Sequence, residues 1–372
     1  MSLKKIHIIA DEHIWCVEQA FESLAGFDVN LTTLPLHQIT SDVVHDADVL
    51  LTRSGIKVDA KLLQDSTVRF AGTATIGDDH YDKAWLNEQG ITWATAAGSS
   101  TISVVEYMLA SLFEMQAQGR VDFNTMSLGI IGVGRIGRLL AHVCEHLGIH
   151  VLRNDPPRQR CEGSADFVSL DDLLEQANVI TLHTPLIREG VDKTELLLNA
   201  HHLARFQGQG IINAARGQCV DNQALLHWLN ADEKHWTIMD CWQHEPNILL
   251  PLLTHDQCRL ATPHIAGHSL DGKAANTQYI YRALCAYLNI EETWDMESAL
   301  PPVTCMADED ESWDTLVHRF YSIKQDSEAL KATALLNDDE RGKQFVHLRR
   351  HYPIRRRWMK QSMKAKALFE GA

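Results

Sequence analysis

Three side chains with complementary chemistry follow short apolar segments in the second half of the chain: Arg216, Glu245 and His264. An arginine can hold a carboxylate through two parallel hydrogen bonds. An imidazole accepts a proton near neutral pH, and a neighbouring carboxylate orients the ring and stabilises its charged form. Oxidising a secondary alcohol that carries a carboxylate requires both groups, because the hydroxyl proton must be removed as the hydride departs. We therefore expect these three residues to be catalytic.

Each of these residues alone also has an ordinary structural interpretation. An arginine at a strand end is usually a salt-bridge partner, a glutamate before proline is usually a solvated loop residue, and the chain holds 20 histidines. A catalytic role is favoured because the Arg, the Glu and the His occur together, in this order, downstream of a glycine-rich turn. Asp221 is the opposite case, because it precedes a helical pattern over residues 222–230 and is predicted to be a helix N-cap.

The glycine-rich turn is a G-x-G-x-x-G formed by Gly132, Gly134 and Gly137. It follows an apolar segment, opens a helical pattern and precedes Asp155 by 18 residues, which is the context of a dinucleotide-binding fingerprint. Asp155 could accept hydrogen bonds from the ribose hydroxyls and repel a 2′-phosphate, so we expect NAD as the cofactor. Arg158, three residues later, keeps NADP as an alternative cofactor. The alternative to a cofactor site is a strand–turn–helix in which the glycines only allow the tight turn.

The elements that must position these residues alternate between strand and helix. Strands are predicted at 5–11, 47–54, 68–75, 127–134, 150–155, 178–185, 209–216, 235–242 and 258–265. Helices are predicted at 14–26, 82–90, 100–119 and 135–148, and Ser169 is predicted to cap another. Such alternation is typical of parallel sheets covered on both faces. The fold class is therefore α/β, with two Rossmann-like, doubly wound parallel sheets.

Composition excludes several other classes of protein. The 372 residues hold 34 Lys and Arg against 49 Asp and Glu, and the net charge of −15 argues against a nucleic-acid partner. No apolar run is long enough to span a membrane, and the N-terminus lacks the apolar run of a signal peptide. The eight cysteines are scattered without a C-x-x-C, so we expect reduced thiols, no metal and a cytoplasmic location.

The segments 132–137, 215–221, 240–246 and 262–267 together resemble the D-isomer specific 2-hydroxyacid dehydrogenases. Within that family, further segments resemble the branch that oxidises 4-phospho-D-erythronate with NAD in pyridoxal 5′-phosphate biosynthesis. They are 53–58, 72–82, 104–112, 154–158, 180–186 and 262–274. The basic segment 345–358 resembles the extra dimerisation domain of that branch. The resemblance implies a homodimer and a C-terminal α+β domain.

The resemblance also implies three domains and a set of site residues. The domains are a substrate domain over 1–100 with a return segment at 267–290, an NAD-binding domain over 101–266 and a dimerisation domain over 291–372. Arg216, Glu245 and His264 are implied as catalytic. Ser54, Thr75 and His268 are implied on the substrate. The implied cofactor contacts are Gly132, Gly134, Arg135, Ile136, Gly137, Asp155, Thr184, Ala214, Ala215, Asp240 and Gly267.

Two departures and two alternatives remain at this point. His268 stands where that branch has a tyrosine, and the chain stops soon after its basic C-terminal segment. A phosphoglycerate or hydroxypyruvate enzyme would share the Arg, Glu and His. A corepressor-like protein that senses NAD could also retain all three. The residues that bind the substrate phosphate are not defined by the motifs, with Arg53 and the basic segment as candidates.

Overall fold

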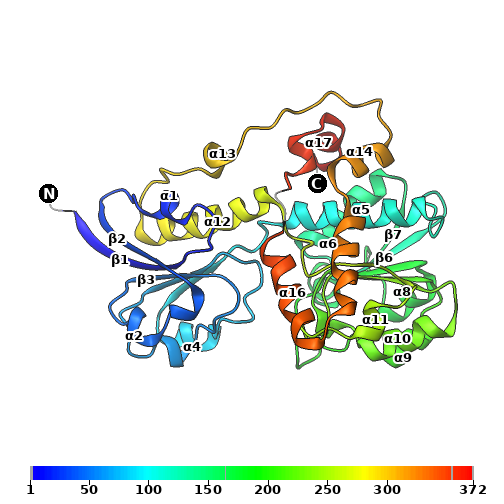
Figure 1. The fold of residues 1–372 in the computed structure, drawn as a ribbon, viewed down its shortest axis with the longest axis horizontal. Helices are drawn as coiled ribbons and strands as arrows, with labels where there is room; N and C mark the ends of the chain where they lie inside the picture. Colours follow the sequence, from blue (N-terminus) through cyan, green and yellow to red (C-terminus); the bar gives the residue numbers. More distant parts are fainter. Residues whose placement is uncertain (1–2, 164, 353–354, 371–372) are drawn as a thin grey trace. The chain divides into compact units, whose positions relative to one another are not determined.

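The computed structural model describes residues 3–163, 165–352 and 355–370 (Figure 1). The chain divides into two compact units. Unit 1 combines the residues up to 100 with residues 269–302, and unit 2 combines residues 101–268 with those from 303 onward.

Unit 1 is built on a five-stranded parallel sheet with the order β2-β1-β3-β4-β5. Its strands are β1 (Lys4–Asp11), β2 (Phe27–Leu34), β3 (Val49–Thr52), β4 (Phe70–Thr73) and β5 (Thr92–Thr95). Its helices are α1 (Val17–Phe21), α2 (Ser41–Val44), α3 (Ala60–Leu63), α4 (Lys83–Glu88), α12 (Leu270–Leu288) and α13 (Met296–Ala299). One apolar cluster includes Phe21 of α1 and Ile280 of α12, and a second includes Leu63 and Leu86. Both faces of the sheet are therefore covered.

Unit 2 is built on a six-stranded sheet with the order β11-β10-β9-β8-β6-β7, and every pairing in it is parallel. Its strands are β6 (Ser127–Ile131), β7 (His150–Asn154), β8 (Val179–Leu182), β9 (Gly210–Asn213), β10 (Trp236–Met239) and β11 (Cys258–Ala261). Its helices before residue 268 are α5 (Thr101–Ala117), α6 (Arg135–His146), α7 (Pro156–Glu162), α8 (Leu170–Gln176), α9 (Ala200–Arg205), α10 (Asn222–Ala231) and α11 (Leu250–Leu253). The strand order reverses between β6 and β8, which is where such sheets bind ligands.

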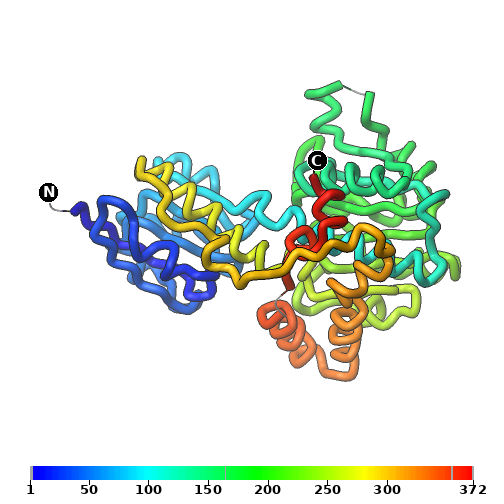
Figure 2. The backbone as a smooth tube through the Cα atoms, turned by 90° about the horizontal axis from the view of Figure 1, so that it is seen from above, coloured from blue at the N-terminus to red at the C-terminus, as the bar shows by residue number. Residues whose placement is uncertain are grey.

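The C-terminal segment of unit 2 differs from the predicted separate α+β domain. Its described residues form α14 (Trp313–Phe320), α15 (Ile323–Lys331), α16 (Asp338–Arg350) and α17 (Met363–Phe369), with no strand among them. An isolated β-bridge joins Met306 and Ser362. The segment, orange to red in Figure 2, lies along unit 2 because its apolar side chains enter the same cores as the sheet. Val317, Trp358 and Leu368 join the apolar cluster that contains α5 and α6. Leu330 and Phe345 join the second apolar cluster of unit 2.

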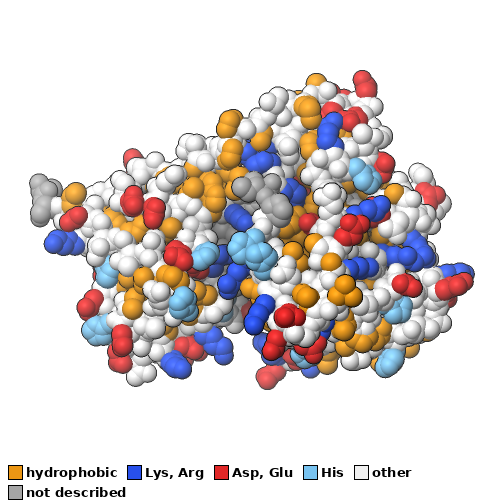
Figure 3. Space-filling view, in the orientation of Figure 1, with side chains coloured by type: hydrophobic (Ala, Val, Ile, Leu, Met, Phe, Trp, Pro, Cys, Tyr) orange, Lys and Arg blue, Asp and Glu red, His pale blue; other side chains and the backbone are white. Residues whose placement is uncertain are grey.

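The return segment of unit 1 is also longer than predicted, since it extends to residue 302 rather than 290. Leu300 explains the difference, because its buried side chain packs with Leu270 and Ala274 of α12. No helix among the described residues is long and apolar enough to cross a membrane. On the face drawn in Figure 3, acidic and basic side chains are interspersed over both units.

Candidate active site

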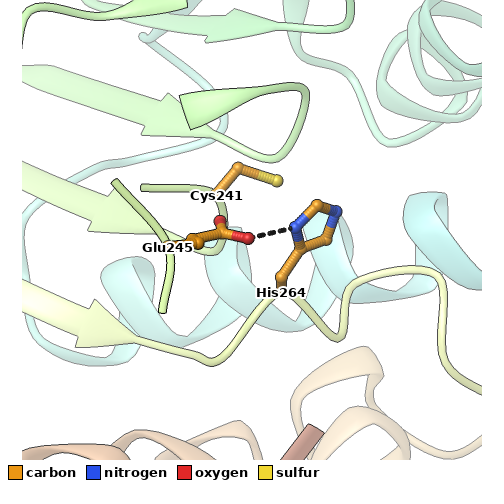
Figure 4. A group of neighbouring side chains, drawn as sticks. All are labelled: Cys241, Glu245 and His264. Atoms are coloured by element: carbon orange, nitrogen blue, oxygen red, sulfur yellow. Dashed lines mark hydrogen bonds and ion pairs between the residues drawn. The ribbon is translucent and has the colours of Figure 1, made fainter. Parts of the chain in front are cut away.

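A hydrogen-bonded pair of His264 and Glu245 forms the centre of the candidate site (Figure 4). Nδ1 of His264 lies 2.8 Å from Oε2 of Glu245, and Oε1 of the same carboxylate accepts the backbone N–H of Trp242 at 2.8 Å. His264 follows β11 in a turn where its own φ is +57°, and Glu245 follows β10. An Nδ1–H that donates to the carboxylate leaves Nε2 as the nitrogen able to accept a proton.

The environment of Glu245 keeps its carboxylate charged. Burial by itself raises the pKa of this group, but the charge and hydrogen bond of His264, the N–H of Trp242 and the charge of Arg349 together hold the pKa below its ordinary value. A charged carboxylate is what stabilises an imidazolium during proton transfer. The pair is therefore suited to general base catalysis rather than to a purely structural contact.

Asp240 fixes the turn that carries His264. Its Oδ1 accepts the hydroxyl of Thr262 and the N–H of Ile265, each at 2.7 Å, and its Oδ2 accepts the N–H of Ala266 at 3.0 Å. Burial raises the pKa of Asp240, against the opposing charge of His264 and these hydrogen bonds. The implied contact of Asp240 with the cofactor stays a prediction. In the structure, the oxygens of this carboxylate organise the turn.

Arg216 follows β9 and is held beside the same loops. Its Nη1 donates to the carbonyl of Ala215 at 2.9 Å. The side chain of Asn213, fully buried, donates to the carbonyl of Arg216 at 3.0 Å and to that of Cys241 at 3.2 Å. One amide thus joins the loop of Arg216 to the loop that leads to Glu245. The three catalytic candidates therefore belong to one set of loops in unit 2, at the carboxyl ends of β9, β10 and β11.

The glycine turn after β6 has the geometry that a dinucleotide requires. Gly132 has φ +89°, and a Cβ there would lie 2.8 Å from the carbonyl carbon of His183. A Cβ at Gly137 would overlap the carbonyl of Gly132, so helix and strand could not pack as closely. Beside Gly134, the N-cap of α6, the position of a Cβ has open space within 4 Å. The N-terminus of a 12-residue helix facing open space fits the pyrophosphate of NAD.

Asp155 stands at the end of β7 and caps α7. Its Oδ2 accepts the N–H of Val133 at 2.8 Å, and its Oδ1 accepts the N–H of Arg158 at 3.1 Å. The carboxylate is thus fixed beside the glycine turn, as a ribose ligand must be. The guanidinium of Arg158 donates to both oxygens of Glu162, at 2.7 and 2.5 Å. Arg158 was the reason to keep NADP as an alternative cofactor, and in the structure its charge is paired with this glutamate.

The other predicted cofactor residues lie around this turn or at the ends of neighbouring strands. Arg135 and Ile136 are the first two residues of α6, and Thr184 lies two residues after β8. The predicted set is completed by Ala214 and Ala215 after β9 and Gly267 after the His264 turn. Their roles as cofactor contacts stay predictions, although their placement at the carboxyl edge of the unit 2 sheet is consistent with them.

The predicted substrate residues are divided between the two units. His268 belongs to unit 2, where its ring stands edge-on to Tyr352 at 6.0 Å between centroids. Ser54 and Thr75 belong to unit 1, where they follow β3 and β4. Ser54 is exposed, whereas the hydroxyl of Thr75 donates to the carbonyl of Gly77 at 2.9 Å. The bond of Thr75 is the local turn contact expected of such a hydroxyl.

Cys241, Glu245 and His264 offer potential metal ligand atoms within 4.8 Å of one another (Figure 4). The thiol of Cys241 donates to the carbonyl of Ala215 at 3.3 Å, and burial raises its pKa well above the ordinary value. A thiolate ligand must lose its proton, and Nδ1 of His264 is already engaged with Glu245. The arrangement is better described as a hydrogen-bonded His–Glu pair beside a buried thiol.

Two functional neighbours of the site were missed by sequence reasoning. Tyr107 of α5 forms a 2.8 Å hydrogen bond with Thr262 Oγ1, 155 positions away, and so supports the Asp240 turn. Arg349 of α16 lowers the pKa of Glu245 by its charge. Neither residue has a local sequence signal, because each acts only after distant segments have packed together.

Comparisons with known proteins agree with this geometry. The family described as D-isomer specific 2-hydroxyacid dehydrogenase, NAD binding domain, matches residues 102–266. The fold is shared with an NAD⁺-bound 3-phosphoglycerate dehydrogenase of Entamoeba histolytica, with TM-score 0.63, 20% identity and coverage of 77% of this chain and 96% of that one. A D-lactate dehydrogenase of Aquifex aeolicus gives TM-score 0.59, 21% identity and coverage of 76% and 95%. The fold and the site thus define a D-isomer specific 2-hydroxyacid dehydrogenase.

The sequence relatives narrow the family further. An erythronate-4-phosphate dehydrogenase of Marinobacter nauticus is 42% identical over 361 residues, which cover 94% of this chain and 92% of the relative. One of Pseudomonas fluorescens is 41% identical over 359 residues, with the same coverage. The chain belongs to the erythronate-4-phosphate dehydrogenase family.

Proposed function

We propose that this chain oxidises 4-phospho-D-erythronate at C2 to 2-oxo-3-hydroxy-4-phosphobutanoate with NAD, as a step of pyridoxal 5′-phosphate biosynthesis. The observation that carries the chemistry is the 2.8 Å hydrogen bond between His264 and Glu245, which follow strands of the same sheet as the glycine turn. The names of the 42% and 41% identical relatives support the substrate.

The residues divide the work of an alcohol oxidation. Nε2 of His264 accepts the proton of the C2 hydroxyl, and Glu245 stabilises the resulting imidazolium through Nδ1. Arg216 holds the substrate carboxylate and polarises the oxygen that becomes the carbonyl. NAD supplies the acceptor for the hydride that leaves C2. In the reverse direction the imidazolium returns the proton to the carbonyl oxygen.

The cofactor would be held by the turn after β6 and by the ends of the neighbouring strands. Gly134, Arg135 and Ile136 offer helix N-terminal N–H groups to the pyrophosphate. Asp155 offers its carboxylate to the ribose hydroxyls, and the pairing of Arg158 with Glu162 favours NAD over NADP. We further propose that Ser54, Thr75 and His268 bind the substrate.

The proposal includes a homodimer and a cytoplasmic location. The homodimer rests on the resemblance of the basic segment 345–358 to the extra dimerisation domain of this branch. All eight cysteines are free thiols, which suits a reducing compartment. Light scattering on the purified chain tests the dimer, because a monomeric mass at micromolar concentration contradicts it.

The substrate is tested by a single-turnover assay that follows NADH formation. 4-Phospho-D-erythronate is compared with D-3-phosphoglycerate at equal concentration, with enzyme in excess so that slow product release cannot hide the chemistry. We expect a signal with the four-carbon acid only. A signal with the three-carbon acid instead would keep the class of enzyme and overturn the substrate.

A further inference from the structure

Two cations of unit 1, Arg53 and Lys273, stand at the carboxyl edge of its sheet. Arg53 directly follows β3. Lys273 lies in the first turn of α12, where its N–H donates to the carbonyl of the N-cap Ser269 at 2.9 Å. In open parallel sheets this is the edge where ligands bind.

The loop after β1 brings the two cations to the same place. Arg53 Nη1 donates to the carbonyl of His13 at 3.4 Å. Thr277, one helical turn beyond Lys273 on the same face of α12, donates to the carbonyl of Trp15 at 2.7 Å. Arg53 and the N-terminal part of α12 that carries Lys273 therefore both pack against one short loop, residues 12–16. Burial and then the charge of Arg53 lower the pKa of Lys273.

This pair has the electrostatics of an anion site. Lys273 is partly buried, and it forms no ion pair with any residue that the structure describes. Its partial burial carries a desolvation cost, and the charge of Arg53 adds repulsion to it. A dianion beside Lys273 would relieve both penalties of this lysine, at the N-terminal turn of the 19-residue helix α12 that also carries Asp271.

We propose that Arg53 and Lys273 form the subsite for the phosphate group of the substrate, with the exposed hydroxyl of the adjacent Ser54 as a further donor. The inference rests on the proposed function, which requires a carboxylate and a phosphate to be bound by different groups. Arg216 is assigned the carboxylate, and the sequence motifs left the phosphate without a ligand. The subsite makes the chain selective for phosphorylated acids over the same acids without phosphate.

The test measures kcat/KM for 4-phospho-D-erythronate and for D-erythronate in wild type and in Lys273→Met. We expect the preference for the phosphorylated acid to fall about 10- to 100-fold in the variant, which is the range for losing one charge-assisted hydrogen bond. Arg53→Met should give a similar loss. Lys61→Met is the matched control, because Lys61 is an exposed lysine of α3 in the same unit, and this control should keep the wild-type preference.

Equal losses for both acids, or an unchanged preference, would overturn the subsite while leaving the proposed function intact. If wild type does not oxidise 4-phospho-D-erythronate, the proposed function fails, and the subsite is then tested with inorganic phosphate alone. Broadening of the ³¹P resonance by wild type and by Lys61→Met, but not by Lys273→Met, supports the subsite. No broadening by wild type, or equal broadening by all three, overturns it.

Discussion

Nδ1 of His264 lies 2.8 Å from Oε2 of Glu245, while the backbone N–H of Trp242 holds the other oxygen of that carboxylate at 2.8 Å. The glutamate is therefore fixed from one side and orients the imidazole on the other. This assigns the two nitrogens of His264 different tasks, because Nδ1 is committed to Glu245 and Nε2 is left for the substrate.

Replacing His264 by Ala should reduce kcat by about 10²- to 10⁴-fold, because the hydroxyl proton then has no positioned acceptor. NAD affinity, measured by fluorescence titration, should stay close to wild type. His227→Ala is the matched control, since His227 is exposed on α10 and should leave both quantities unchanged. Equal loss of turnover and NAD binding in His264→Ala would contradict a role in proton transfer.

Replacing Glu245 by Gln should lower kcat/KM by at least about 10²-fold, because the amide cannot stabilise an imidazolium by charge. The carboxylate of Glu245 is charged in the wild type, because its pKa is held below the ordinary value against the effect of burial. An unchanged kcat/KM in the variant would argue that this charge does not act on His264.

Asp155 is predicted to set cofactor preference. Asp155→Ala should raise the Kd for NAD about tenfold through the loss of ribose hydrogen bonds. It should also narrow the preference for NAD over NADP, because the repulsion of a 2′-phosphate is removed. Asp221→Ala is a suitable control, because Asp221 also caps a helix, through Gln223 and Ala224, and should lose stability without a change in preference. An unchanged preference in Asp155→Ala would remove Asp155 from the ribose site.

The buried ion pair of Glu106 and Arg355 should be a main contributor to the attachment of the C-terminal segment. Arg355 Nη1 lies 2.7 Å from Glu106 Oε2, with 7% and 0% of their side chains exposed, and Arg355 Nη2 donates to the carbonyl of His268. Glu106→Gln should lower the free energy of unfolding by about 3–5 kcal/mol, since it leaves a buried charge unpaired. Glu370→Gln, which breaks an exposed pair, should change it by less than about 1 kcal/mol.

Urea denaturation of both variants checks this difference. A loss in Glu106→Gln no larger than that in Glu370→Gln would show that the buried pair does not hold the segment. We also expect kcat to fall together with stability in Glu106→Gln. Arg355 donates to the carbonyl of His268, which belongs to the loop after His264.

His183 should make the protein less stable in mild acid. Burial lowers its pKa to about 3 from 6.5, and its Nδ1 has no solvent access. Between those pH values the unfolded chain binds a proton that the folded chain does not, so stability falls as pH falls below about 6.5, by about 1.4 kcal/mol per pH unit. His183→Gln should reduce the stability difference between pH 7 and pH 5 by about 2 kcal/mol. The same reduction in the exposed-site control His227→Gln would contradict the assignment.

The sequence predicted all six strands of the unit 2 sheet and the three central strands of the unit 1 sheet, but not the edges of the unit 1 sheet. Every predicted strand is present within a few residues, because buried parallel strands are continuous apolar runs. The two strands that were missed, β2 and β5, are the edges of the unit 1 sheet, where half-exposed positions dilute the apolar pattern. The predicted helix 14–26 contracts to α1 because Cys16 adopts a left-handed conformation before it.

Some residues of the candidate site could be predicted from the sequence and others could not. The glycine turn, the cap at Asp221 and the order of Arg216, Glu245 and His264 are local signals, and the structure places each where it was predicted. Tyr107 and Arg349 could not be predicted, since both act through contacts with residues that are distant in the chain. For a similar reason, the sequence did not predict which core the apolar side chains of the C-terminal segment join, because composition does not reveal such distant contacts.

The central claim is that this chain moves the C2 hydrogen of a phosphorylated D-2-hydroxy acid to NAD as a hydride. The most direct test is a single turnover with 4-phospho-D-erythronate deuterated at C2, followed by mass and NMR analysis of the reduced cofactor. We expect one deuterium at C4 of the nicotinamide ring and a slower chemical step than with the unlabelled acid. Reduced cofactor without deuterium, or release of the label to water, would contradict it.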